Sequence, residues 1–215
     1  MAGFWIDQNR GLGGIVKVTY DSGLTACAMT CSSCHAREDD GALTVGVGNS
    51  NLNLGWGPGL LDVTTTVGTE PVIISDIRPT RFLTHLHHDG NVVQKNLETL
   101  AIRIETLIVT QRSQTLRPPR EVAWALASYV WSLSSSLPQV PPSDAPGADI
   151  FRTTCGACHD PDQGFTGAPV PIGEVGTDPM LGLSPDRGTG NYRVPSLRGV
   201  GQRGALLHDA SITSL

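Results

Sequence analysis

Two five-residue stretches dominate this sequence: Cys31-Ser32-Ser33-Cys34-His35 and Cys155-Gly156-Ala157-Cys158-His159. Each follows the pattern C-x-x-C-H, which is the attachment sequence of a c-type haem. Two thiols at this spacing bind one porphyrin covalently, and the histidine that follows them can reach the iron. We therefore predict two covalently bound haem c groups. The covalent attachment points are Cys31, Cys34, Cys155 and Cys158, and the proximal iron ligands are His35 and His159.

The alternatives for a single C-x-x-C motif are a redox-active dithiol or a zinc site. Two copies that each end in histidine, and that together use four of the five cysteines, favour haem. The fifth cysteine, Cys27, is predicted to be a small buried residue. A disulfide or a redox role for Cys27 is the other interpretation.

The composition fits a protein that builds its core around prosthetic groups. Of the 215 residues, 39% are hydrophobic and 5% aromatic, with 25 glycines and 15 prolines. Such a chain forms a thin core unaided, and a haem adds a large apolar surface. The net charge of −5 argues against nucleic acid and against a polybasic membrane-binding surface. No run reaches the roughly 18 apolar residues that a membrane-spanning helix needs.

The expected compartment is the periplasm or another exported location, because haem attachment to this motif normally takes place outside the cytoplasmic membrane. Residues 1–7 (Met-Ala-Gly-Phe-Trp-Ile-Asp) lack the basic start and apolar core of a secretory signal. We therefore expect a mature or otherwise incomplete chain.

Residue patterns predict mostly helices and loops. A short strand is expected at 15–20, where apolar residues alternate, and a helix at 24–36 that carries the first motif. Residues 41–63 are rich in glycine and are expected to form a loop. Apolar residues at helical spacing predict a helix over 96–109, and Pro118-Pro119 opens another. Residues 148–159 repeat the pattern of a helix that leads into the second motif.

Prolines and serines between 132 and 148 mark a boundary. The predicted organisation is an N-terminal extension (1–20), a first domain (21–136), a linker (137–147) and a short second domain (148–215). The extension is a candidate flap across a partner or across the other domain. The predicted fold class is mainly α, with two tandem, loop-rich, cytochrome c-like helical domains that each hold one haem.

Each iron also needs a ligand on its distal face, unless that face is open. For the first haem we predict His87, with His85 as second choice, from the cluster that also contains His88; surface histidines are the alternative. For the second haem the candidates are Met180, on a Pro-Met loop, and His208. Loop packing for Met180, a surface or supporting position for His208, and an open iron site are the alternatives.

Two arginines near the C-terminus, Arg193 and Arg198, are candidate partners of the haem propionates, because a guanidinium matches a carboxylate with two hydrogen bonds. The other interpretation, which has equal weight, is that both arginines are solvated charges on the surface.

The two motifs, the proline-rich linker, residues 192–200 (YRVPSLRGV) and residues 207–211 (LHDAS) together resemble the bacterial di-haem cytochrome c peroxidase superfamily. The likeness covers most of the chain beyond about residue 20. It implies a periplasmic protein of two helical haem domains with electron transfer between the haems, one of which sometimes reduces peroxide.

The sequence also departs from that family. In peroxidases the methionine ligand of the second haem lies downstream of the segment that matches His208-Asp209. Here the sequence ends at Leu215, so that position and the closing helix of the second domain are missing. Either the chain is incomplete or a different ligand, Met180 or His208, is used.

The favoured function is electron transfer between a redox donor and a redox acceptor, with a subunit of a membrane complex as one setting. The alternative is a di-haem peroxidase or related oxidoreductase with one open or labile iron and a distal acid or base. Candidate acids or bases are Glu70, Asp76, Glu98 and His208. Their spacing assigns none of them a catalytic role.

Overall fold

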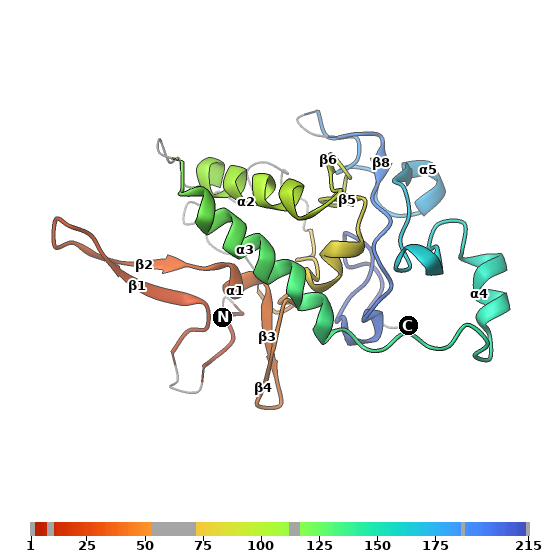
Figure 1. Cartoon of the computed structure of the whole chain (residues 1–215), viewed down its shortest axis with the longest axis horizontal. Coiled ribbons are helices and arrows are strands. Elements are labelled where there is room, and N and C mark those ends of the chain that lie inside the picture. The colour runs from red at the N-terminus through yellow and green to blue at the C-terminus, as the bar shows by residue number, and fades with distance from the viewer. Residues whose placement is uncertain (1–2, 8–10, 53–71, 112–116, 186–187, 214–215) are drawn as a thin grey trace.

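The fold begins with two β-hairpins on either side of the first motif. The computed structural model describes residues 3–7, 11–52, 72–111, 117–185 and 188–213 (Figure 1). Strands β1 (Ile15–Thr19) and β2 (Thr25–Met29) pair antiparallel, and so do β3 (Ala36–Asp39) and β4 (Ala42–Val45). The one-turn helix α1 (Cys31–Cys34) connects the hairpins. The β1–β2 hairpin projects from the body of the protein, and the β3–β4 hairpin extends in a different direction (Figure 1).

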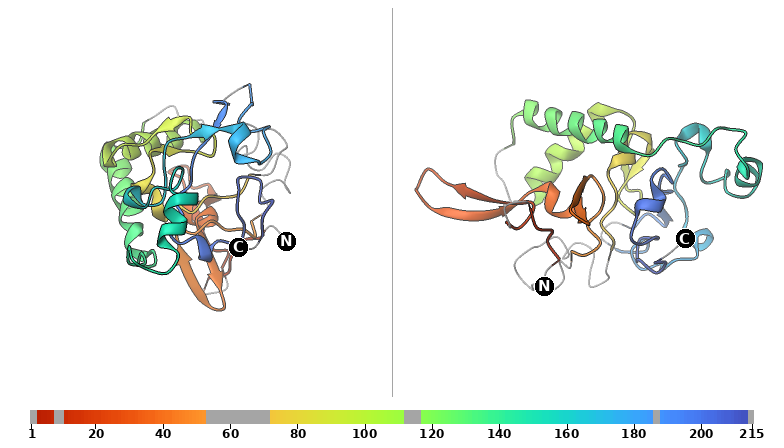
Figure 2. Two further views of the ribbon diagram at one scale, coloured as in Figure 1. Left: turned by 90° about the vertical axis from the view of Figure 1, so that its right-hand side faces the viewer. Right: turned by 90° about the horizontal axis from the view of Figure 1, so that it is seen from below.

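The middle of the chain forms the helical layer. It contains η2 (Arg78–Phe82), a small hairpin of β5 (His85–Leu86) and β6 (Val92–Val93), α2 (Leu97–Gln111), α3 (Arg120–Ser132) and η3 (Leu133–Ser136). The long helices α2 and α3 lie side by side in the views of Figures 1 and 2. They enclose the hydrophobic cluster of Leu100, Ala101 and Ala127.

The last third of the chain is mostly loop. Its elements are α4 (Ala148–Thr154), η4 (Pro161–Gln163), β7 (Val170–Pro171), α5 (Ile172–Val175), β8 (Asn191–Tyr192) and η5 (Val200–Gln202). Strands β7 and β8 pair antiparallel. Many of its contacts run back to residues 73–91, so the residues around the second motif pack against the middle of the chain.

The predicted fold class is wrong. Helices account for 31% of the structure and strands for 18%, so the protein is not a mainly α pair of cytochrome c-like helical domains. The first motif is the clearest case, because it lies between two hairpins. The predicted helices at 96–109 and after Pro118-Pro119 are confirmed as α2 and α3, and the predicted strand at 15–20 is confirmed as β1.

The predicted helix over 24–36 is also wrong. Residues 25–29 form β2, because β1 needs a partner for its main-chain hydrogen bonds and the turn ending at Leu24 brings this segment alongside it. Cys27 consequently points out of a two-stranded hairpin and is exposed, not buried. Part of the predicted loop at 41–63 is β4, and residues 53–63 lie outside the described ranges.

The helix that leads into the second motif is shorter than predicted. It is confirmed as α4, but α4 ends at Thr154, and the motif itself forms a turn. Among the described helices, none combines the length and the apolar character that crossing a bilayer requires.

Candidate functional site: two haem-attachment motifs

The N-terminal segment folds back onto the first motif. The hydroxyls of Thr30 and Ser33 donate to the main-chain carbonyl of Gly14 at 2.8 and 2.7 Å. The indole Nε1 of Trp5 donates to the carbonyl of Ser32 at 3.0 Å. Gly14 has φ +77°, and a Cβ there would overlap the backbone of Ser33. Trp5 and Gly14 therefore support the first motif directly.

The histidine of the first motif, His35, is held by one ring nitrogen. Its Nδ1 donates to the main-chain carbonyl of Ser75 at 3.0 Å. Burial lowers the pKa of His35, which favours the neutral imidazole that metals bind. Its Nε2 makes no hydrogen bond to any residue within the described ranges.

The histidine of the second motif, His159, is held in the same way. Its main-chain N–H donates to the carbonyl of Cys155 at 2.8 Å, which closes the turn. Its Nδ1 donates to the main-chain carbonyl of Phe165 at 3.1 Å. Phe165 adopts a positive φ of 61°, and its ring packs edge-on against Phe151 of α4 with centroids 5.5 Å apart. The turn and the preceding helix thus position this carbonyl.

Both motifs fit a covalently bound haem. A metal-binding histidine typically donates its second ring N–H to a carbonyl or carboxylate, and this sets the tautomer that presents the other nitrogen to the metal. His35 and His159 both satisfy this condition through main-chain carbonyls. The four motif cysteines are free thiols, as thioether formation requires.

Three arginines have buried donors without partners. In the described part of the chain, the Nε atoms of Arg193, Arg198 and Arg203 are sealed from solvent and form no hydrogen bond. Burial, with a smaller contribution from Arg203, lowers the pKa of Arg193 to about 10. Unpaired buried guanidinium donors fit a nearby anion such as a propionate. Arg193 and Arg198 as propionate partners nevertheless stay a prediction, and Arg203 joins them as a third candidate.

The preferred distal ligand of the first haem, His87, is engaged on both ring nitrogens. Nδ1 lies 2.6 Å from Oδ1 of Asn91, and Nη2 of Arg103 donates to Nε2 at 2.7 Å. The second choice, His85, belongs to β5 and has its Nδ1 3.1 Å from Oγ1 of Thr84. Both assignments stay predictions, and binding of iron by His87 would require its contact with Arg103 to open.

The residue given least weight in that cluster, His88, contacts Ser75, whose carbonyl holds His35. Its Nε2 donates to the carbonyl of Ile73 at 2.9 Å and is 3.2 Å from Oγ of Ser75. Burial, which dominates, lowers the pKa of His88 to about 3, with a further contribution from Arg193. His88 is therefore neutral, and it is linked through Ser75 to Nδ1 of His35.

Sequence reasoning missed a repeated turn that brings His88 and His208 together. Residues 86–90 (LHHDG) and 206–210 (LLHDA) both place a positive φ one residue before the histidine, at His87 and Leu207, and again two residues after it. Each turn is closed by matching antiparallel pairing, Leu86 with Val92 and Leu206 with Ile212. The two histidine rings are 6.3 Å apart. The shared His-Asp pair was the available signal.

The two candidate ligands of the second haem lie in one neighbourhood. His208 is buried, stacks on Tyr192 with centroids 4.5 Å apart, and has Nδ1 3.3 Å from Oγ1 of Thr177. Met180 is 58% exposed, and its main-chain N–H donates to Asp178, whose carbonyl accepts from Tyr192. Both assignments stay predictions.

The candidate acids and bases are scattered. Asp76 is buried in an ion pair with Arg78, with Nη2 and Oδ2 2.7 Å apart. Glu98 is exposed in the first turn of α2, and Glu70 lies outside the described residues. The structure therefore brings Asp76 near His35 but commits its carboxylate to another residue.

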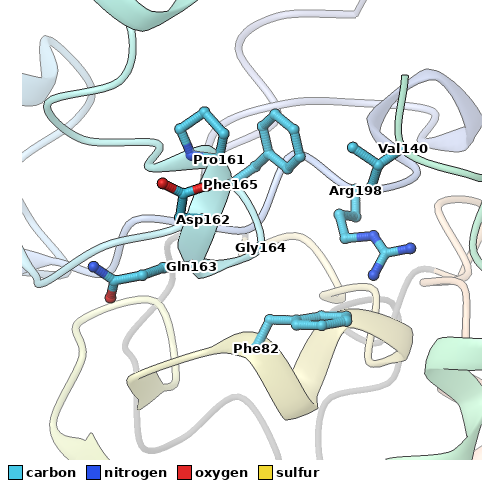
Figure 3. A pocket seen from close by; sticks show the side chains of 8 residues that line it. All are labelled: Phe82, Val140, Pro161, Asp162, Gln163, Gly164, Phe165 and Arg198. Atoms are coloured by element: carbon cyan, nitrogen blue, oxygen red, sulfur yellow. The ribbon is translucent and has the colours of Figure 1, made fainter. Parts of the chain in front are cut away.

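A cavity borders the loop that holds His159. It has a volume of about 460 Å³ and lies between Phe82 of η2 and residues 161–165 (Figure 3). The guanidinium of Arg198 extends over the ring of Phe82, 4.6 Å from its centroid. This cavity has the size of a small-molecule pocket and presents one cation next to the second motif.

No protein-family model, curated protein or solved structure matches this chain. The resemblance to di-haem cytochrome c peroxidases therefore stays a prediction that rests on the motifs.

Proposed function

We propose that this protein is a di-haem c-type electron-transfer protein, exported from the cytoplasm, that passes electrons between a redox donor and a redox acceptor. The observation that carries the proposal is the shared geometry of the two motifs. In each, the histidine after the second cysteine donates Nδ1–H to a main-chain carbonyl and keeps Nε2 for a metal. A redox dithiol gives no reason for this pair of matched histidines, and haem is favoured over zinc by the C-x-x-C-H spacing of both motifs.

In this proposal the chain's own residues attach and orient the haems. Cys31 and Cys34, and likewise Cys155 and Cys158, form the thioether links, while His35 and His159 are the proximal ligands. Haem supplies reversible one-electron chemistry, with a potential set by its ligands and their hydrogen bonds. The buried arginines balance propionate charge.

Electron transfer is favoured over peroxidase chemistry because of the state of the candidate acids. A distal acid or base must reach the bound oxidant with an available proton site. Of the candidates that the structure describes, Asp76 is committed to Arg78, Glu98 lies on an exposed helix surface, and the ring of His208 stacks on Tyr192. Peroxide reduction is kept as the alternative outcome of the experiments below.

The first experiment counts haems. The protein is produced in a bacterium with periplasmic haem-attachment machinery, and haem per chain is measured from the pyridine haemochrome spectrum. We expect two haems in the wild type and one in each of the variants C31A/C34A and C155A/C158A. Cys27→Ala is the matched control, because it removes an exposed thiol outside both motifs and should leave two haems. A wild type without covalent haem would refute the proposal.

The second experiment separates the two functions. Spectra of the oxidised and reduced protein are recorded with and without carbon monoxide, and peroxide turnover is assayed with a one-electron donor. Low-spin haems that do not respond to carbon monoxide support electron transfer. A high-spin iron with rapid peroxide turnover would instead establish the peroxidase.

A further inference from the structure

One segment, residues 192–198, lies behind the histidines of both motifs. On the side of the second motif, the main-chain N–H of Leu197 donates at 3.1 Å to the same Phe165 carbonyl that accepts from His159. Thr166 Oγ1 donates to the carbonyl of Val194 at 2.5 Å, and Ser196 Oγ donates to that of Gly164 at 2.6 Å. The segment thus sets the position of the carbonyl that holds His159.

The same segment reaches the first motif through Arg193. Its main-chain N–H donates to the carbonyl of His88 at 2.8 Å, and its Nη2 donates to Oγ of Ser75 at 3.4 Å. The Ser75 carbonyl is the acceptor for His35, so Arg193 is two contacts away from the predicted iron ligand. We call residues 192–198 the shared segment.

The two ends of the shared segment differ in the groups that hydrogen-bond to the parts of the chain that hold the two histidines. The hydrogen bonds to the loop around His159 involve hydroxyls and a main-chain amide, all neutral, and the Arg198 guanidinium borders the same loop but extends over the ring of Phe82. The group that faces Ser75 is a guanidinium, beside the neutral His88 ring. Of the other charges nearby, Asp76 and Arg78 neutralise each other. Arg203 lowers the pKa of Arg193, whereas Asp89 raises it.

We propose that Arg193, acting through Ser75, is a positioning residue that selectively raises the reduction potential of the first haem. Ser196 is the corresponding positioning residue of the second haem, because its hydroxyl holds the loop around His159 through the carbonyl of Gly164. The inference rests on the proposed function. Reduction takes one electron from the redox partner and removes one positive charge from the iron. A nearby fixed cation therefore favours the reduced state.

The test is a spectroelectrochemical titration of the holoprotein, with haem signals assigned from C31A/C34A and C155A/C158A. At an effective dielectric constant of about 20, two unit charges roughly 10 Å apart change an equilibrium about tenfold. We expect Arg193→Met to lower the ratio of reduced to oxidised first haem by about tenfold at fixed ambient potential, equivalent to a shift of about 59 mV for one electron. The second haem should be unaffected.

Ser75→Ala provides a milder variant, because it removes the hydroxyl contact and keeps the carbonyl that binds His35. It should move the first haem in the same direction by less. Ser196→Ala is its counterpart and should move only the second haem. Arg120→Met is the matched control, since Arg120 is an exposed arginine in the first turn of α3 and lies outside the shared segment.

The outcomes separate the inference from the proposed function. Two attached haems with an unmoved first potential in both Arg193→Met and Ser75→Ala would overturn the inference alone. Equal shifts of both haems would overturn it too, because they indicate general loosening. If Arg193→Met does not fold, Ser75→Ala and Ser196→Ala decide the matter. A wild type without haem would overturn the proposed function and the inference together.

Discussion

Removing one partner of the buried ion pair of Asp76 and Arg78 should destabilise the protein strongly. Only 2% of the Asp76 side chain and 1% of the Arg78 side chain are exposed. The carboxylate of Asp76 accepts from Nε and Nη2 of Arg78 and from its main-chain N–H at 2.9 Å. Removing one charge leaves the other buried and uncompensated, which costs about 3 to 5 kcal/mol. We expect Asp76→Asn to lower the free energy of unfolding by this amount.

Urea unfolding of the holoprotein, followed by far-UV circular dichroism, measures the effect. With a denaturant slope of about 2 kcal/mol/M, the loss lowers the midpoint by roughly 1.5 to 2.5 M. Asp39→Asn is the matched control, because its partner is also an arginine, Arg37, at 2.6 Å but the Asp39 side chain is 53% exposed. An exposed pair contributes at most about 1 kcal/mol. The double variant D76L/R78M should recover most of the loss, since no lone charge remains. A loss in Asp76→Asn no larger than in Asp39→Asn would refute this reasoning.

Two further predictions concern the core and the first motif. Leu100→Ala, in the cluster between α2 and α3, should lower the free energy of unfolding by about 2 to 5 kcal/mol. Ile102→Ala is its control and should change the free energy of unfolding by less than about 0.5 kcal/mol, because Ile102 is 63% exposed. Urea titration measures the free energy of unfolding of both variants. Gly14→Ala should reduce haem occupancy at the first motif only, because the new Cβ overlaps the backbone of Ser33. Gly23→Ala, also at positive φ but with open space around it, should leave both haems attached; equal haem content in the two glycine variants would contradict the proposed contact.

The elements that could be predicted from sequence are those with strong local signals. Helices α2 and α3 have apolar residues at helical spacing, Pro118-Pro119 precede α3, and β1 has alternating β-branched residues. The segment 24–36 was misassigned because the strand at Thr25–Met29 depends on pairing with β1 rather than on its own residue preferences. The exposure of Cys27 follows from the same pairing.

The residues of the candidate site also fall into those that could be predicted from the sequence and those that could not. The distal candidates His85, His87, Met180 and His208 were found from residue type alone, and their roles stay predictions. The connection between Ser75 and His88 was missed, because a serine and the third histidine of a cluster carry no local signal of what lies opposite them. The His-Asp turns at His88 and His208 could have been found by comparing the two halves of the chain.

What the sequence by itself determined is the presence and spacing of the two motifs, from which covalent haem attachment is predicted. The spacing of Cys31, Cys34 and His35, and of the matching second set, is local, so it is readable without the fold. Only the tertiary structure decided which groups hold the two histidines. These are the carbonyl of Ser75, 40 residues from His35, and that of Phe165. A main-chain carbonyl is present in every residue, so no residue type marks it, and only the folding of residues 192–198 behind both sites shows how they are connected.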